Sequence, residues 1–392
     1  MPKNWSHSIS FYTKQILALA LKILEICSCF PPSKGGVERC VYELSTRFAE
    51  RNHKVVVATS SRGKKAKFHK ERIDKLDVIR FPERFHIFEA PILPTLSMTA
   101  LFADYDVLHV HGMSPTITDL SIFFAKLRGK PVVLTYHNDA ESDRWGRIAK
   151  VAAFVYSTLA SAVIRRADVI VSSTRSYAET SPALKPSLDR LKVIPMGVDA
   201  EKYEQLDLTE KDDSEHDLLF VGQLKDYKGV EVLLEAIYYL RLEGHNVKLK
   251  VVGTGPESGN LRRQARLLGL EQDVLFLGNV SDTELMELYA TCDSLVLPSL
   301  NRREAFGIVL LEAIAAGRNV VASDIPGVNE VASLGGGYLA RPNDAQSLAN
   351  SILSSLQNKR HPESIRMVAK ELSWDKLAAK YLSIFEELVT KS

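Results

Sequence analysis

The segment DSLVLPSLNRREAFGIVLLEAIAAG, from Asp293 to Gly317, decides the fold expected for this chain. An apolar run, Ser294 to Leu297, stops at Pro298, and a polar loop then leads into a second apolar stretch that closes at Gly317. Apolar runs bounded in this way by proline and glycine are typical of a buried strand and of a helix. The segment therefore predicts a strand, a loop and a helix in one unit.

Two glutamates stand on this segment. Glu304 lies in the loop ahead of the helix and Glu312 about two turns further on, with Ala305, Phe306 and Gly307 between them. The unpaired N–H groups at a helix start carry roughly half a positive charge and favour an anion, best a phosphate. A carboxylate repels phosphate, so we expect both glutamates to accept hydrogen bonds from sugar hydroxyls. This predicts a nucleotide-sugar site. The alternative is that Glu304 is an ordinary acidic loop residue and Glu312 a solvated residue on the helix surface.

The segment EAFGIVLLEAIAAG resembles the motif of two glutamates separated by seven residues that marks the retaining family-four (group 1) glycosyltransferases, which have the GT-B fold. The resemblance extends from about Leu21 to the end of the chain. An ordered series of further segments carries it: PPSKGGVERCVYELSTRFAERNHKVVVAT, YHND, IPMGVD, FVGQLKDYKGVEVLLEAI, VVGTGP and LGNVSDTELMELYATCDSLVLPS. The ordered series makes the resemblance far more specific than the glutamate motif alone.

The resemblance implies an α/β fold of two Rossmann-like, parallel-sheet domains that face each other across a cleft, with a C-terminal helix that crosses back to the first domain. The segment VIPMGVD, Val193 to Asp199, resembles the domain junction, although Met196 stands where many relatives have asparagine. We therefore divide the chain into an N-terminal extension (1–20), an acceptor-binding domain (21–198), a nucleotide-sugar-binding domain (199–372) and a crossover helix (373–392).

Apolar runs alternate with amphipathic stretches along the chain, as in parallel βαβ units. The strands expected in the first half are Leu21–Cys29, Lys54–Thr59, Asp77–Phe81, Val107–Val110 and Val132–Tyr136. Helices are expected over Trp145–Arg166, Val230–Leu242 and Ser373–Leu388. The apolar stripe of the first is expected to face the core, with membrane contact as the second choice.

The donor is expected to bind mainly to the second domain. Lys228 comes just before a predicted helix, where an ammonium and the helix N–H groups together suit a pyrophosphate. The resemblance adds the backbone of Gly307 and Ile308 for the pyrophosphate, Glu312 for the ribose hydroxyls and Glu304 for the transferred sugar. The full predicted donor-binding set is Gly35, Gly36, Gly222, Gln223, Lys228, Val280, Glu304, Ala305, Phe306, Gly307, Ile308 and Glu312.

Three further members of this set have their own reasons. Gly35 and Gly36 follow the first strand and permit a close approach of the backbone to phosphate or sugar, although a plain strand-to-helix turn is the alternative. Val280 closes a strand whose end, by resemblance, lies under the nucleotide base. These positions extend the predicted site from the second domain into the first.

Gln223 departs from the family pattern, because relatives usually carry an arginine there. A glutamine supplies no charge. We expect Lys225, Arg302 or Arg303 to compensate, or phosphate binding to be weaker; for Lys225 a solvated loop position is the alternative.

Histidines follow the ends of two predicted strands. His137 stands in YHND, directly after one predicted strand, and His109 and His111 are placed at the end of another. A lone histidine is more often structural, but the resemblance places His137 in the active-site cleft, near the sugar and able to polarise a hydroxyl. The predicted catalytic residues are therefore Glu304, His137 and Lys228.

The resemblance implies transfer of a hexose, of mannose or glucose type, from a GDP- or UDP-linked donor to a glycan or lipid-linked acceptor. It also implies retention of the anomeric configuration with no metal and no cofactor, because helix N-termini and Lys228 neutralise the departing diphosphate. A nucleotide-sugar epimerase and a catalytically weak sugar-nucleotide-binding regulator are the alternatives. No nucleic-acid partner is expected.

Charge is divided unevenly along the 392 residues. Residues 1–200 hold 29 Lys+Arg against 19 Asp+Glu, a balance of +10, which leaves 21 against 29, or −8, for the remainder. Within the basic half, Arg62–Lys75 is a candidate patch for anionic lipid or a phosphorylated acceptor, or else a solvated loop. The run Ile16–Phe30 is too short and too charged to span a membrane. We expect a cytoplasmic protein, with peripheral contact to the cytoplasmic membrane face as the further possibility.

Overall fold

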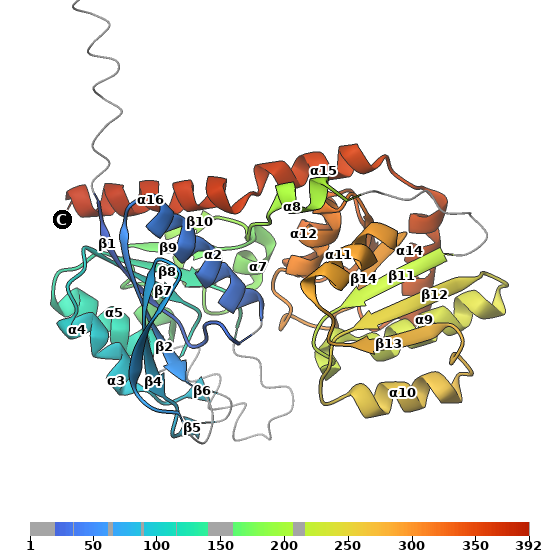
Figure 1. Ribbon diagram of the computed structural model, residues 1–392, viewed down its shortest axis with the longest axis horizontal. Coiled ribbons are helices and arrows are strands. Elements are labelled where there is room, and N and C mark those ends of the chain that lie inside the picture. The colour runs from blue at the N-terminus through green and yellow to red at the C-terminus, as the bar shows by residue number, and fades with distance from the viewer. Residues whose placement is uncertain are drawn as a thin grey trace, which may run out of the picture.

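The computed structural model describes residues 20–33, 35–61, 66–87, 90–114, 116–139, 160–206 and 216–391. Two α/β domains lie side by side, and a long C-terminal helix runs from the second across the first (Figure 1). The predicted architecture of two parallel-sheet domains with a crossover helix is confirmed.

The first domain is built on an eight-stranded sheet in the order β10-β9-β8-β7-β1-β2-β4-β3. Its strands are β1 (Lys22–Ile26), β2 (Lys54–Ser61), β3 (His69–Ile73), β4 (Leu76–Pro82), β7 (Val107–His111), β8 (Val132–Tyr136), β9 (Val169–Ser172) and β10 (Leu191–Val193). Neighbouring strands are parallel except β3 and β4. The pair β5 (His86–Ile87) and β6 (Ala90–Pro91) forms a separate small hairpin.

Helices cover both faces of this sheet. They are α2 (Gly36–Glu50), α3 (Pro94–Ser97), α4 (Thr99–Phe102), α5 (Thr118–Leu127), α7 (Arg175–Thr180), the 3₁₀ helix η2 (Lys185–Arg190) and, at the domain junction, α8 (Ala200–Glu204). Successive strand residues point to opposite faces. Ile23 and Val107 therefore join the core under α2, whereas Leu24 and Leu108 join the core under α5.

The second domain holds a six-stranded parallel sheet in the order β13-β12-β11-β14-β15-β16. Its strands are β11 (His216–Val221), β12 (Val247–Val252), β13 (Val274–Gly278), β14 (Ser294–Leu297), β15 (Asn319–Ser323) and β16 (Tyr338–Ala340). Its helices are η3 (Asp226–Lys228), α9 (Val230–Leu242), α10 (Ser258–Leu267), α11 (Asp282–Thr291), α12 (Ile308–Ala315), α13 (Val328–Leu334), α14 (Ala345–Gln357) and α15 (Pro362–Glu371).

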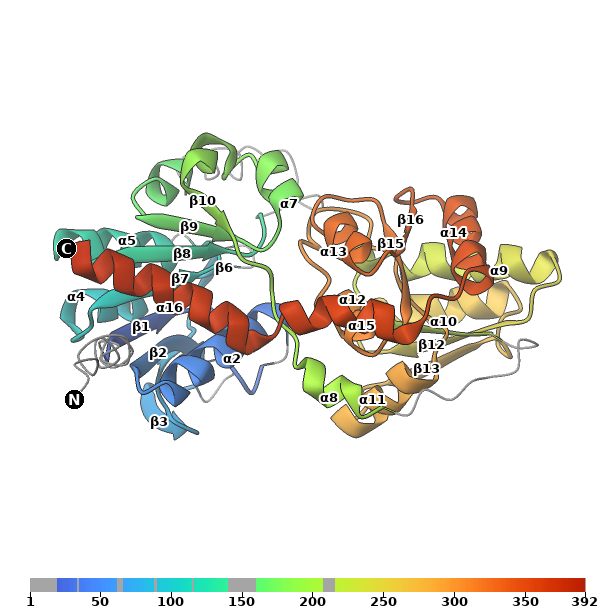
Figure 2. The same cartoon turned by 90° about the horizontal axis from the view of Figure 1, so that it is seen from above.

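The C-terminal helix α16 (Trp374–Lys391) returns to the first domain and lies beside α2 (Figure 2). Val198 N–H donates to the Leu372 carbonyl at 2.9 Å where the two connections between the domains meet. Phe48 of α2 packs edge-on against Phe385 of α16, with ring centroids 5.5 Å apart. This apolar contact fixes the crossover helix on the first sheet.

Two differences from the sequence predictions concern the first domain. Strand β1 ends at Ile26 rather than Cys29, so the loop before α2 starts earlier. The basic run Arg62–Lys75 contains a strand, β3, which pairs with β4.

Residues 62–65 of that run and most of the helix predicted over Trp145–Arg166 lie outside the described residues. Within the described part of the chain, none of the helices has the length and apolar character needed to cross a bilayer.

Candidate active site

The loop between β14 and α12 is held by a glycine in a conformation that other residues rarely adopt. Gly307 has φ 74° and ψ 63°, in the left-handed region, and caps the start of α12. A methyl group added there would lie 2.6 Å from Leu297 Cδ2, so a side chain would also clash. Ala305 and Phe306, just before it, are 8% and 3% exposed. The tight turn therefore fixes the direction from which the N–H groups of α12 are reached.

Lys228 and Glu304 form an ion pair across this loop. Each side chain is 13% exposed. The backbone brings them together, since Leu300 N–H donates to the Tyr227 carbonyl at 2.7 Å and Gly229, with φ 67°, packs against Pro298. Two of the three predicted catalytic residues are thus in direct contact.

The ion pair keeps Lys228 charged. Burial alone lowers the pKa of this ammonium, but attraction and a hydrogen bond to the Glu304 carboxylate, together with Tyr227, outweigh it, and the pKa is raised above its usual value. A methyl group added at Gly222 would lie 3.6 Å from Lys228 Nζ, so the glycine backbone lies directly beside the ammonium. A cation beside a glycine backbone suits a phosphate.

Glu312 is buried, with 4% of its surface exposed, and the interpretation as a solvated helix residue is wrong. Its Oε2 accepts a hydrogen bond from the Tyr289 hydroxyl at 2.7 Å. Its Oε1 pairs with Arg39 of α2, in the other domain. Burial opposes the charge on Arg39, but Glu312, together with Tyr203 and Glu43, outweighs it and raises the pKa of the guanidinium. A carboxylate has about four acceptor positions, and Tyr289 and Arg39 do not use all of them. That ribose hydroxyls bind to the others stays a prediction.

Arg39 was not among the residues predicted from the sequence. It lies one turn into α2, whose first residue, Gly36, faces α12: a methyl group added at Gly36 would lie 4.0 Å from Ile308 Cγ2. The starts of α2 and α12 therefore approach each other across the domain boundary. Gly35 adopts an extended conformation, with φ 179°, and the Glu38 side chain fills the space beside it.

The two arginines expected to compensate for Gln223 are engaged elsewhere. Arg302 pairs with Asp139 of the first domain at 2.8 Å, and Arg303 lies 3.3 Å from Asp226. The Gln223 side chain is exposed. Either arginine would have to leave its carboxylate partner to reach a donor phosphate.

The remaining predicted residues lie at the edges of this arrangement. Val280 is half-buried in the turn between β13 and α11. His137 directly follows β8 and is 3% exposed. Burial and the neighbouring rings of His111 and His109 hold its pKa well below 6.5, so it is neutral at pH 7.

One group of side chains within the described ranges has a composition that suits a metal: Glu25, His109 and His111. The Glu25 carboxylate lies 3.0 Å from His109 Nδ1 and 2.8 Å from His111 Nε2. Ligand atoms around a tetrahedral zinc stand about 3.3 Å apart, given Zn–N and Zn–O distances near 2.0 Å. The observed distances are those of hydrogen bonds instead.

The sequence contains an Asp-x-Asp spacing, Asp104 and Asp106, that resembles a metal motif. Asp104 pairs with Lys22 Nζ at 2.6 Å, and Asp106 accepts from Lys22 N–H at 2.8 Å. These contacts lie at the amino end of β1, whereas Gly35, His137 and the other predicted residues follow the carboxyl ends of strands. Both aspartates serve to hold the start of the sheet.

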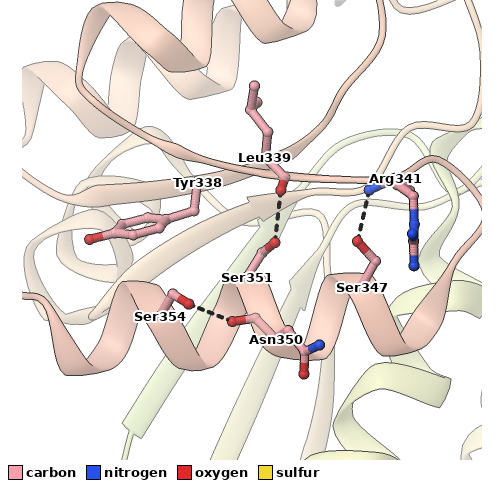
Figure 3. Close-up of a pocket in the computed structure, with 7 residues that line it drawn as sticks. All are labelled: Tyr338, Leu339, Arg341, Ser347, Asn350, Ser351 and Ser354. Atoms are coloured by element: carbon pink, nitrogen blue, oxygen red, sulfur yellow. Dashed lines mark hydrogen bonds between the residues drawn. The ribbon is translucent and has the colours of Figure 1, made fainter.

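A surface hollow between β16 and α14 is separate from the predicted site (Figure 3). Its polar groups bond to one another: Ser351 donates to the Leu339 carbonyl at 2.9 Å and Ser347 accepts from Arg341 N–H at 3.0 Å. None of the predicted site residues lines it.

Two family models match the chain in succession. The model described as Glycosyltransferase Family 4 covers residues 34–202, and the one described as Glycosyl transferases group 1 covers residues 202–372. The O-antigen chain mannosyltransferase C of Escherichia coli is 28% identical over 92% of this chain and 96% of its own length. The D-rhamnosyltransferase WbpZ of Pseudomonas aeruginosa is 30% identical over 74% of each chain.

Solved structures share the fold. Sucrose-phosphate synthase from Thermosynechococcus elongatus matches with a TM-score of 0.73 at 21% identity, over 95% of this chain and all of its own. Anabaena Alr3699/HepE in complex with UDP matches with a TM-score of 0.68 at 19% identity, over 94% and 100%. The predicted GT-B fold is confirmed, and the chain belongs to the group 1 glycosyltransferases of family four.

Proposed function

We propose that this enzyme transfers a hexose, of mannose or glucose type, from a nucleoside diphosphate sugar to a glycan or lipid-linked acceptor with retention of configuration. The observation that carries the proposal is the Lys228–Glu304 ion pair, which lies beside Gly222 at the loop that leads into α12. A site for a nucleoside diphosphate sugar needs a cation to bind the diphosphate and a hydrogen-bond acceptor to bind the sugar hydroxyls. The pair supplies both.

Each charged group has a separate proposed role. Lys228 and the N–H groups at the start of α12 bind the diphosphate and stabilise the charge that develops as it leaves. Glu304 accepts hydrogen bonds from hydroxyls of the transferred sugar, and Glu312 accepts them from the ribose. Because the ammonium and the helix start supply positive charge at the leaving group, we propose that no metal is required.

Retention is proposed to follow a path on one face of the sugar. The bond between the anomeric carbon and the diphosphate oxygen breaks, and the acceptor oxygen bonds to the same carbon from the same side. The acceptor hydroxyl proton passes to an oxygen of the leaving phosphate. No covalent bond to the enzyme is formed in this path, and Glu304 serves as a hydrogen-bond acceptor throughout.

The donor is proposed to be GDP- or UDP-linked. Relatives named as a mannosyltransferase and a D-rhamnosyltransferase, and a neighbour solved with UDP, support a nucleotide-sugar donor of this kind. A panel of nucleotide sugars tested by thermal shift identifies the base and sugar, since a ligand at a hundred times its Kd stabilises by about 2.7 kcal/mol. NMR of the product then gives the anomeric configuration.

The same panel separates the alternatives. Transfer that depends on an acceptor supports the proposal. Release of free nucleoside diphosphate with an altered sugar, and no need for an acceptor, indicates an epimerase. Binding of a donor without transfer or hydrolysis, across a broad set of acceptors, indicates a regulator.

The acceptor is proposed to bind the basic first domain, with peripheral contact to an anionic membrane at the cytoplasmic face. Lys67 and Lys70 are exposed, and Phe68 beside them is 56% exposed. Charge reversal at Lys64, Lys65 and Lys67 should lower cosedimentation with anionic vesicles, because each lysine near such a surface contributes about 1 kcal/mol. If the variant cosediments with the vesicles as well as the unmodified protein does, the run Arg62–Lys75 is better interpreted as a solvated loop.

A further inference from the structure

Buried polar side chains gather on one face of three adjacent strands of the first sheet, where the core is otherwise apolar. Glu25 on β1 stands opposite His109 on β7, and His111 stands opposite Thr135 on β8. His137, two residues beyond Thr135, continues the same row. These five side chains are between 0% and 4% exposed. Buried polar groups are costly unless each finds a partner, so their hydrogen bonds can be traced.

The hydrogen bonds form one chain that ends at His137. The Glu25 carboxylate contacts His109 Nδ1 at 3.0 Å and His111 Nε2 at 2.8 Å. His111 Nδ1 lies 3.2 Å from His137 Nε2, and the two rings are within 14° of parallel. At the other end, His109 Nε2 contacts Thr135 Oγ1 at 2.8 Å.

The carboxylate determines where the protons lie along this chain. An ionised carboxylate only accepts hydrogen bonds, so His111 must donate from Nε2. Burial and His109 lower the pKa of His111 to about 4, so it is neutral at pH 7 and its Nδ1 carries a lone pair. Burial raises the pKa of Glu25, but His109 and His111 outweigh it and lower the value to about 2. His137 must therefore donate from Nε2.

The other nitrogen of His137, Nδ1, is left as an acceptor. His137 Nδ1 is buried and has no hydrogen-bond partner among the residues that the structure describes. Two residues further on, Asp139 pairs with Arg302 of the β14–α12 loop at 2.8 Å, so His137 lies next to the contact between the domains. His137 thus lies two residues from the point where the loop that carries Glu304 meets the first domain.

We propose that Glu25 and His111 are positioning residues that fix the tautomer of His137, so that His137 Nδ1 offers a lone pair to a hydroxyl of the bound sugar. This proposal rests on the function proposed above. The site then requires a hydroxyl donor at that position of the sugar. A carboxylate or an O-methyl group at the same position only accepts and would leave the nitrogen unpaired, which disfavours uronic acids and O-methyl sugars there.

The tautomer can be measured in the full chain without any substrate. Histidine labelled with ¹⁵N gives two-bond H–N correlations that distinguish a protonated from an unprotonated ring nitrogen, and His137→Gln identifies the His137 signals among the 10 histidines. At pH 7.5 we expect Nε2 protonated and Nδ1 unprotonated in His137. A protonated Nδ1 in the unmodified protein would overturn the proposal, whatever the activity.

A pair of variants tests the positioning role. His111→Phe removes the acceptor for His137 Nε2; it should give mixed His137 tautomers and lower kcat/KM about tenfold, the cost of one buried hydrogen bond. Tyr381→Phe is the matched control, because its hydroxyl bonds Thr135 Oγ1 at 3.0 Å at the far end of the same chain. It should leave the tautomer unchanged and kcat/KM within about twofold.

The outcomes separate this proposal from the proposed function. Equal losses of kcat/KM in both variants, with the His137 tautomer unchanged, would reduce Glu25 and His111 to structural residues. The expected tautomer in a chain that transfers no sugar would support the hydrogen-bond chain and contradict the glycosyltransferase proposal instead. Thermal unfolding of both variants shows whether either loss reflects instability.

Discussion

The two sides of the candidate site are held by different chemistry. On the second domain the carboxylates are paired with cations: Glu304 with Lys228, and Glu312 with an arginine of the first domain. On the first domain, the carboxylate of Glu25 accepts hydrogen bonds from the rings of His109 and His111, and His111 in turn contacts His137. Ion pairs organise the second-domain side of the site, whereas hydrogen bonds that fix the protonated nitrogen of each histidine organise the first-domain side.

The difference decides how each side can respond to a ligand. A half-buried ion pair can exchange one partner for a diphosphate, because the incoming anion replaces the charge that is lost. A fully buried hydrogen-bond chain cannot exchange partners without leaving a polar group unpaired, at a cost of about 1–3 kcal/mol. The second domain should therefore bind the charged part of the donor, whereas the first domain should orient an uncharged part. Variants that alter charge or proton position test this division.

The largest effect is expected for Lys228→Ala. Removal of the ammonium takes away the positive charge proposed to stabilise the leaving diphosphate, and kcat/KM should fall about 1000-fold. Initial rates with the donor found in the thermal-shift panel give the value. Lys370→Ala is a suitable control, because Lys370 pairs with Glu204 at 2.8 Å and is not in the predicted site. A loss of kcat/KM below about tenfold would contradict the proposed role of Lys228 in stabilising the leaving diphosphate.

Glu304→Gln should lower kcat about 100-fold and leave the affinity for the nucleoside diphosphate within about threefold. The amide keeps the shape of the side chain, but it loses the negative charge and one of the two acceptor oxygens, which becomes an NH₂ donor. Lys228 then has no carboxylate competing with the diphosphate, so any change in affinity should be towards tighter binding. Calorimetric titration with the diphosphate and steady-state kinetics separate the two effects. Weak diphosphate binding with normal turnover would reverse the assignment.

Glu312→Ala should raise the donor Kd about tenfold and change kcat by less than about threefold, because the proposed ribose contact is equal in ground and transition states. The matched variant is Tyr289→Phe, which removes one hydrogen bond to Glu312 and keeps the pair with Arg39. It should have the smaller effect on Kd. If both variants bind donor normally but unfold more easily, Glu312 is a structural anchor between the domains.

Elements with a strong local pattern were predicted well. The helix over Val230–Leu242 and the strand over Val132–Tyr136 have the predicted bounds, since each shows a clear apolar period between turn signals. The Lys228–Glu304 pair joins residues 76 apart. Lys228 ends the short 3₁₀ helix η3 and Glu304 stands on the loop between β14 and α12, and the sequence pattern marks both segments as sites. Strand β3 was missed because its residues are mostly charged, and a pairing partner rather than local composition makes it a strand.

The contacts that were missed depend on tertiary arrangement. Arg39 and Glu312 are 273 residues apart, and no local pattern relates them. The chain of Glu25, His109 and His111 did leave a signal, since polar residues recur at alternate positions within apolar strands. That signal becomes informative only once β7 is known to lie beside β1, and the order of strands in a sheet does not follow from the strands themselves.

The smallest effect expected is a pH dependence of stability that belongs to the first domain. His111 has a pKa of about 4 in the folded chain against 6.5 for an ordinary histidine, because burial and His109 disfavour its charged form and outweigh Glu25. Below pH 6.5 the unfolded chain therefore binds a proton that the folded chain does not, and stability falls as the pH falls. Between pH 7.5 and 5.5 the loss from this one group should be about 1 kcal/mol.

Urea unfolding of the unmodified chain and of His111→Phe, each at pH 7.5 and pH 5.5, isolates this loss. The variant is less stable at both pH values, but it lacks the titrating ring, so its stability should change less between them. The other groups that face His111 are Glu25, His109 and His137, and all three remain in the variant. An equal pH dependence in both proteins would mean that the hydrogen-bond chain does not hold His111 neutral. The contrast between a side organised by ion pairs and a side organised by hydrogen bonds to neutral rings would then fail.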